Sequence, residues 1–127
     1  MFKLVAVGGK LRGQSFELQD GDNIVGRSSG CEVAIAVEGV SKKHFKITVN
    51  GNNCYIQDLG SSNGTFVNSK LVKSSTVTNK DQIAIPNVIF QVVYVKEKIV
   101  RKEGSFKDTE MDYSLEAKEE MPNDLGG

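Results

Sequence analysis

The stretch His44-Phe45-Lys46-Ile47-Thr48-Val49-Asn50-Gly51 alternates polar and apolar residues and then reaches a turn. The apolar side chains from Phe45 to Val49 occupy every second position, which is the period of a strand with one face on a core. The polar side chains between them, together with His44, are expected on the side that faces solvent or loops. Asn-Gly between two apolar runs is a strong hairpin signal. The stretch therefore predicts a β-strand that turns tightly into a second one.

Short runs rich in Val, Ile, Phe and Thr extend from this stretch in both directions, and no helical period occurs before residue 95. Turn-forming residues such as Asp20-Gly21-Asp22, Asn68-Ser69 and Pro86-Asn87 separate the runs. Many short strands at this spacing predict an all-β sandwich or barrel rather than βαβ units. The candidate strands are residues 2–8, 14–18, 23–26, 32–36, 43–49, 53–58, 65–67, 70–72, 76–78, 82–85 and 88–95.

Composition is that of a soluble globular protein, with 39 % hydrophobic and 25 % charged residues in 127. No apolar run approaches the roughly 20 residues that span a bilayer, and the apolar run after Met1 is too short for a signal-peptide core. We therefore expect a cytoplasmic protein without membrane contact. Cys31 and Cys54 are too few for a disulfide scaffold and lack the spacing of a zinc site, so no metal or cofactor is expected.

The chain changes character after Val95. Residues 1–96 carry a small excess of basic side chains, whereas residues 97–127 carry an excess of acidic ones. We expect one domain over residues 1–96, followed by an acidic, largely mobile tail or linker over residues 97–127. A short helix is a candidate at residues 109–121, since Thr109 offers a cap.

Three segments lie in turn-prone breaks between the apolar runs: Gly26-Arg27, Ser41-Lys42-Lys43-His44 and Gly60-Ser61-Ser62-Asn63-Gly64-Thr65. In one sheet system these breaks can meet at one end. They would then gather an arginine, hydroxyls, lysines and an amide, with no acidic residue among them. A guanidinium offers a fixed fork of donors and hydroxyls add short charge-assisted bonds, which suits a phosphate dianion. This set indicates a site that binds phosphate on another protein.

The three segments in this order resemble the forkhead-associated (FHA) domain, whose motif reads Gly-Arg, then Ser-x-x-His, then Asn-Gly. The flanking stretch from Asp58 to Asn68 is close to the usual wording of the family. Residues 79–83, Asn-Lys-Asp-Gln-Ile, resemble the late Gly-Asp-x-Ile segment, with Lys80 in place of glycine. The likeness covers about residues 2–95. It implies an FHA-like β-sandwich of two twisted, mainly antiparallel sheets with about eleven short strands, acting as a phosphothreonine-dependent binding module.

The resemblance also implies roles for individual residues. Arg27 and Ser41 would bind the phosphate, Ser62 would add a hydroxyl or backbone contact, and Asn63 would hold the peptide main chain. Lys42, where many members have asparagine, could make an ionic contact instead. His44 would brace the loops, and Gly26 and Gly64 would permit backbone shapes that a side chain would obstruct.

The implied partner is a phosphothreonine protein or peptide downstream of a Ser/Thr kinase, and the chain would be the regulatory domain of a larger protein. Thr109 is a candidate phosphosite, because Asp112 lies three residues beyond it, a position that family members often read. Phosphorylated Thr109 could bind a neighbouring copy in trans. An ordinary linker threonine is the alternative.

Other function classes fit less well. Ser41, His44 and Asp58 are the residue types of a hydrolase triad, but Ser41 lacks the Gly-x-Ser-x-Gly elbow, so we expect no enzyme. A nucleic-acid site would need Phe45 as a stacking platform, yet its spacing assigns it to the core. A phosphate-independent β-sandwich scaffold that docks a protein partner remains the alternative function.

Overall fold

The computed structural model describes residues 1–96, so the predicted helix at residues 109–121 and Thr109 lie outside the described residues. This part of the chain contains eleven strands and no helix, and therefore no helix that could cross a membrane. The strands are β1 (Phe2–Gly9), β2 (Ser15–Glu17), β3 (Gly21–Gly26), β4 (Val33–Ala34), β5 (Phe45–Asn50), β6 (Asn53–Asp58), β7 (Thr65–Val67), β8 (Lys70–Val72), β9 (Ser74–Val77), β10 (Gln82–Ile85) and β11 (Val88–Tyr94).

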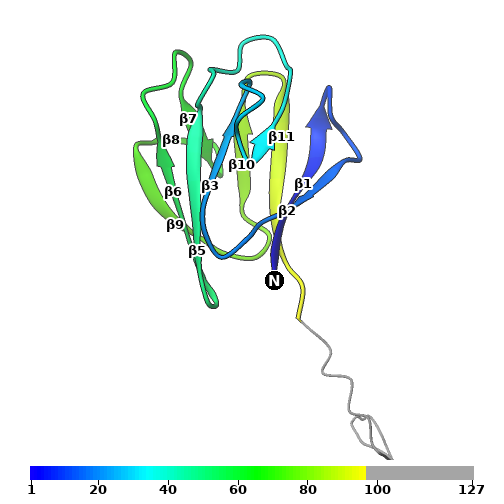
Figure 1. The fold of residues 1–127 in the computed structure, drawn as a ribbon, viewed down its shortest axis with the longest axis vertical. Coiled ribbons are helices and arrows are strands. Elements are labelled where there is room, and N and C mark those ends of the chain that lie inside the picture. Colours follow the sequence, from blue (N-terminus) through cyan, green and yellow to red (C-terminus); the bar gives the residue numbers. More distant parts are fainter. Residues whose placement is uncertain (97–127) are drawn as a thin grey trace, which may run out of the picture. The chain divides into compact units, whose positions relative to one another are not determined.

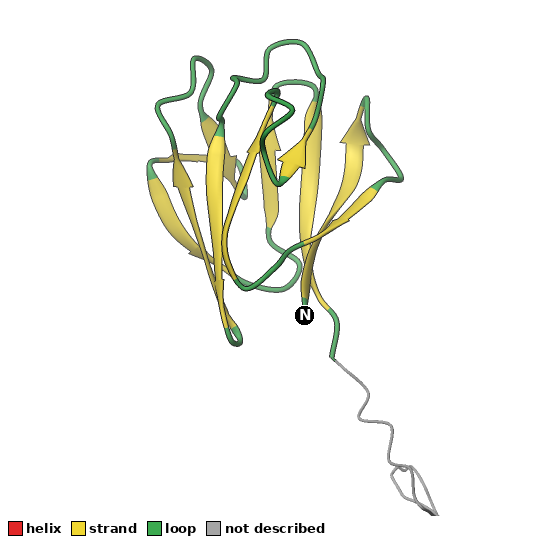
Figure 2. Cartoon of the chain, in the orientation of Figure 1, coloured by secondary structure: helices red, strands yellow, loops and turns green. Residues whose placement is uncertain are grey.

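The strands form two sheets that face each other (Figures 1 and 2). One sheet has six strands in the order β2-β1-β11-β10-β7-β8, and the other has five in the order β4-β3-β5-β6-β9. Only the β3–β4 pair is parallel among the pairs of residues 1–96. The all-β, mainly antiparallel sandwich predicted from the sequence is confirmed.

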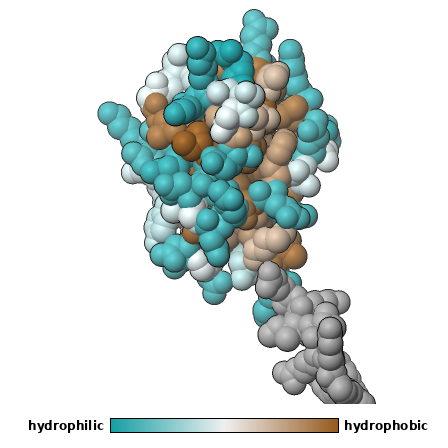
Figure 3. Space-filling model, in the orientation of Figure 1, coloured by the Kyte–Doolittle hydropathy of each residue, from teal (hydrophilic) through white to brown (hydrophobic). Residues whose placement is uncertain are grey.

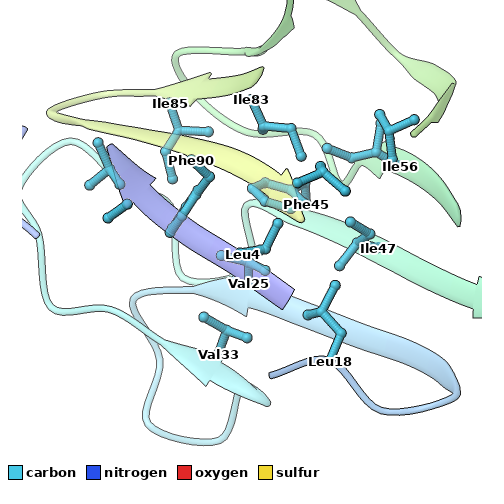
Figure 4. Close-up of a cluster of buried hydrophobic side chains, with 14 of the residues drawn as sticks. Leu4, Leu18, Val25, Val33, Phe45, Ile47, Ile56, Ile83, Ile85 and Phe90 are labelled. Carbon is cyan, nitrogen blue, oxygen red and sulfur yellow. The ribbon is translucent and has the colours of Figure 1, made fainter. Parts of the chain in front are cut away.

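The core lies between the two sheets and takes one face of each strand (Figure 4). Phe45 and Ile47 of β5 are fully buried, as their alternate spacing predicts. Phe45 meets Phe90 of β11 edge-to-face, with ring centroids 6.5 Å apart. Each fully buried large apolar side chain contributes about 1.5–3 kcal/mol. This packing fixes which face of each strand turns inward.

The turns between strands follow from local chemistry. The predicted hairpin joins β5 and β6, and its two-residue loop begins at Gly51, where φ is +63°. The β7–β8 hairpin turns at Asn68 and Ser69, whose φ values are +49° and +71°. Two successive left-handed residues are the geometry of a type I′ turn, which matches the twist of the paired strands.

The segment before β5 differs from the expectation of a strand over residues 32–36. Only Val33 and Ala34 pair, because the ladder with β3 ends at Gly26. Ile35, Val37 and Val40 are nevertheless buried, so their apolar character serves the core and not a sheet. These buried side chains attach the loop that carries Ser41 to the core.

The loops after β3, β4 and β6 lie at the same end of the sandwich, at the top of Figure 1. The N-terminus lies at the opposite end, where Met1 and Val95 exchange backbone hydrogen bonds of 2.7 and 3.0 Å. A ligand bound at the loops would therefore lie far from both ends of the domain.

Candidate functional site

Arg27 begins the loop after β3 and is joined to the loop after β4. Its backbone N–H donates to the Ser41 carbonyl at 3.0 Å, and its Nε donates to the Val40 carbonyl at 2.9 Å. Within residues 1–96 the one side-chain ion pair joins Lys46 to Asp22, so no carboxylate there engages the guanidinium. The exposed Arg27 side chain keeps its terminal N–H groups for an external anion.

Gly26 is required by space. A Cβ at this position would lie 2.2 Å from the Lys42 carbonyl oxygen, which is far inside contact distance. The backbone of β3 can approach the loop after β4 this closely only because residue 26 has no side chain. This close approach places Arg27 beside Ser41. At Gly64 the backbone itself is left-handed, with φ at +89°, a conformation that glycine adopts without strain.

The loops after β3, β4 and β6 are called the first, second and third loops. Ser41 links the second and third loops through its side chain. Its Oγ accepts the Ser62 backbone N–H at 3.0 Å. A hydroxyl that accepts in this way still has its own proton to donate. Ser41 can therefore donate to a phosphate oxygen beside Arg27, while Ser62 presents an exposed hydroxyl at the same place.

His44 is fully buried beneath these loops and does not face solvent. Its Nδ1 accepts the Ser41 backbone N–H at 3.1 Å, and its Nε2 lies 2.8 Å from the Gly64 carbonyl oxygen. Because Nδ1 is an acceptor, Nε2 carries the proton and donates to Gly64, so the ring is neutral. The histidine thus joins the two loops on either side of the site.

Asp58, at the end of β6, holds the third loop together, and the sequence reasoning did not assign it to the site. Its Oδ1 accepts the N–H groups of Gly60 and Ser61 at 2.8 and 2.9 Å. Its Oδ2 accepts the hydroxyls of Ser61 and Thr65, both at 2.6 Å. Burial opposes the charge, but these four bonds outweigh it and lower the pKa of Asp58. An Asp followed by Gly and Ser two and three residues later is the local signal for such a turn.

Asn63 joins the third loop to the second, because its Nδ2 donates to the Gly39 carbonyl at 3.0 Å. One amide proton is used in this bond. The second amide proton and the Oδ1 acceptor remain for a ligand. An amide with one donor and one acceptor matches the hydrogen-bonding groups of an extended peptide main chain.

Asn87, in the β10–β11 turn, supports the second loop from the other sheet. Its Nδ2 donates to the Glu38 carbonyl at 2.9 Å, next to the Gly39 carbonyl that Asn63 uses. A Cβ on Gly39 would lie 2.8 Å from the Pro86 side chain, so the loop rests closely on this turn. The sequence identified Asn87 only as a turn residue.

We predict that Asn87→Gly lowers affinity for the phosphothreonine peptide that the resemblance implies as ligand about fivefold, because one net hydrogen bond is worth about 1 kcal/mol. Glycine keeps the left-handed backbone, since φ at Asn87 is +64°, and removes only the amide. Fluorescence polarisation with a labelled peptide measures the change. Lys80→Gly is the control, because φ there is +77° in a turn at the opposite end, and its affinity should be unchanged. Equal losses in both variants would contradict the supporting role.

Lys42 contributes to the site through its backbone. Its carbonyl accepts the Ser28 N–H at 3.2 Å and the Cys31 thiol at 3.2 Å. Its side chain is exposed and makes no hydrogen bond or ion pair within residues 1–96, so its ionic role stays a prediction. Hydrophilic residues cover much of this end of the domain (Figure 3).

The geometry does not fit a hydrolase. Both ring nitrogens of His44 are bound to backbone groups, the Ser41 Oγ accepts from Ser62, and Asp58 binds its own loop. These three residues therefore make no nucleophile–base–acid chain. Phe45 is fully buried and cannot stack on a base.

The two cysteines are free within the described residues, with Cys31 half-buried and Cys54 buried. Burial raises the pKa of the Cys54 thiol to about 11, so the thiolate that a metal or an oxidant requires is scarce at neutral pH. No group of three metal-ligating side chains occurs in this part of the chain.

A sandwich with a phosphate-suited loop cluster at one end defines a class of binding module. The family model for the FHA domain matches residues 23–86, and the chain belongs to this family. A curated FHA domain-containing protein of Arabidopsis thaliana is 43 % identical over 79 residues, which are 61 % of this chain and 20 % of the relative.

Two solved structures are also similar. One comes from a study of phosphothreonine-dependent FHA domain interactions, with a TM-score of 0.70 and 28 % identity over 76 % of this chain and 98 % of that one. The other is the FhaA FHA domain complexed with the intracellular domain of a second protein, with a TM-score of 0.67 and 28 % identity over 72 % and 99 %. The chain spans 20 %, 14 % and 62 % of the first three curated relatives.

Proposed function

We propose that residues 1–96 bind partner proteins through phosphothreonine, downstream of a Ser/Thr kinase, by way of Arg27, Ser41, Lys42, Ser62 and Asn63. Membership of the FHA family supports this function, as does the similar structure from work on phosphothreonine-dependent interactions. The observation that carries the assignment is the junction of Arg27, Ser41 and Ser62 through direct hydrogen bonds, with no carboxylate of residues 1–96 on the arginine.

The chemistry of binding follows from the donors that these residues keep. Phosphothreonine brings nearly two negative charges and three strong acceptors. The terminal N–H groups of Arg27 neutralise part of the phosphate charge. The hydroxyls of Ser41 and Ser62 donate hydrogen bonds along the lone pairs of the phosphate oxygens. Asn63 then pairs with the peptide main chain, which fixes the register of the ligand. The module acts by binding, because no side chain in this set is available as a nucleophile or general base.

The domain would work as the regulatory part of a larger cytoplasmic protein, with residues 97–127 as the linker. The small share of the first relatives that this chain spans supports such a role. Phosphorylated Thr109 of a neighbouring copy is one candidate ligand within this scheme. Its position in an acidic segment motivates the idea.

Titration of matched peptides tests the function. We expect a degenerate peptide library with a fixed phosphothreonine to yield ligands of micromolar affinity or better. The same sequences with unmodified threonine should bind at least about a hundredfold more weakly, because the charge-assisted bonds are lost. Equal binding of both forms would instead support the phosphate-independent scaffold, whose partner would be unaffected by phosphatase treatment.

A further inference from the structure

One row of side chains crosses the outer face of the six-stranded sheet and is apolar throughout. Pairing aligns Ile89 of β11 with Ala84 of β10, Ala84 with Phe66 of β7, and Phe66 with Leu71 of β8. Gly8 of β1 pairs with Ile89 at the other end. We call these five residues the outer row. Four steps between strands of about 4.8 Å give it a length of about 19 Å.

The outer row faces away from the core. Ile89 lies between the buried Val88 and Phe90, and Ala84 lies between the buried Ile83 and Ile85. Alternation therefore turns both side chains outward. The exposed fractions are 38 % for Ile89 and 67 % for Leu71, the most exposed large apolar side chain among residues 1–96.

The row lies directly beside the loops of the proposed site. A Cβ built on Gly64 would lie 2.7 Å from Leu71 Cδ1 and 3.6 Å from Phe66 Cε1, so both side chains touch the residue that follows Asn63. At the far end, Ile89 stands two residues after Asn87, which binds the loop after β4. On its other side the row is bounded by the paired Gln82 and Gln91. It is a narrow apolar band between polar side chains and the phosphate-binding loops.

We infer that the outer row binds an apolar side chain of the same phosphoprotein, within about five residues of the phosphothreonine. This inference rests on the proposed function. An extended peptide advances about 3.3 Å per residue, so a segment that leaves Asn63 reaches Leu71 within a few residues and can follow the row. The narrow width of the band suits an extended segment better than the broad face of a folded domain. The row thus supplies sequence specificity that the phosphate contacts alone do not provide.

A leucine scan tests the inference. The probes are phosphothreonine peptides of Ala, Ser and Gln, with leucine placed at one position at a time up to about five residues on either side. For the wild-type domain, leucine at one or two positions on one side should raise affinity about five- to tenfold through burial of its side chain. In Leu71→Ser and Ile89→Ser this gain should fall below about twofold, while the leucine-free phosphopeptide binds as to wild type.

Tyr55→Ser is the matched control, because Tyr55 is 43 % exposed on the outer face of the other sheet. It should leave the leucine gain intact. A flat scan on the wild type, or a gain that survives both row substitutions, would overturn the inference while leaving phosphothreonine binding in place. Failure of the leucine-free phosphopeptide to bind would instead overturn the proposed function, and the inference with it. Sedimentation that shows a dimer abolished by Leu71→Ser, together with a flat scan, would assign the row to a second copy.

Discussion

Replacing Arg27 with alanine is expected to lower affinity for a phosphothreonine peptide at least about a hundredfold. A hydrogen bond to a charged group contributes about 1.5–3 kcal/mol, and the guanidinium can donate two such bonds to a single phosphate group. Their loss also leaves nearly two phosphate charges without their main counter-charge. Isothermal titration of wild type and variant with one phosphopeptide measures the change.

The fold should survive Arg27→Ala. The Arg27 side chain is exposed, and the bond that joins its loop to Ser41 comes from the backbone N–H, which alanine keeps. The Nε bond to Val40 is lost, which is expected to cost about 1 kcal/mol of unfolding free energy. A stable variant with lost affinity would therefore report on the ligand contact.

Arg12→Ala provides a matched control for charge. Arg12 is an exposed arginine between β1 and β2, outside the three loops, and its loss changes the net charge equally. Its effect on affinity should stay within about threefold at physiological salt, because Arg12 belongs to none of the three loops and salt screens an exposed charge. Arg27→Lys should retain the charge but lose the fork geometry, so its affinity should lie between that of wild type and that of Arg27→Ala. Unchanged binding by Arg27→Ala would refute the site assignment.

Much of the fold could be predicted because its signals are local. The alternation from Phe45 to Val49 sets both strand and buried face, and Asn50-Gly51 sets the hairpin that follows. Turn residues do the same at Asn68-Ser69. Each of these features needs only a few neighbouring residues, so the sequence contains the whole of the physical cause.

The remainder depends on contacts between distant segments. The strand predicted over residues 32–36 pairs only at Val33 and Ala34, because β3 ends at Gly26. Ile35 and the apolar residues Val37 and Val40 after it fill the core instead. Ser74 and Ser75 are poor strand formers, yet both belong to the edge strand β9 and pair with β6. In both places tertiary structure overrides local preference.

The site shows the same division between local and distant causes. The motif residues could be named from the sequence, but the support of the second loop by Asn87 spans 49 residues and leaves no local pattern. The structure also shows why glycine suits the position at which this chain has Lys80. Its φ of +77° is the left-handed backbone that glycine adopts without strain.

Replacing Asp58 with alanine is expected to destabilise the domain by about 2–4 kcal/mol. The substitution removes four hydrogen bonds and leaves the hydroxyl of the fully buried Thr65 without its acceptor. The third loop would lose the turn that positions Ser62 and Asn63, so phosphopeptide affinity should fall as well. Urea unfolding at pH 7 measures the first effect, with Asp20→Ala in the β2–β3 loop as the control for an exposed aspartate.

The pH dependence identifies the carboxylate charge as the cause. The folded-state pKa of Asp58 lies below its ordinary value of 3.8, so ionisation favours the folded state. This stabilisation is complete above the unfolded pKa and is lost as pH falls through the lower, folded value. The stability difference between wild type and Asp58→Asn should therefore be constant from pH 7 to about pH 5 and shrink below about pH 4. If the stability difference between wild type and Asp58→Asn stays the same down to pH 2, the charge of Asp58 is not what holds the loop. The hydrogen bonds that the uncharged carboxyl group also makes would then hold it.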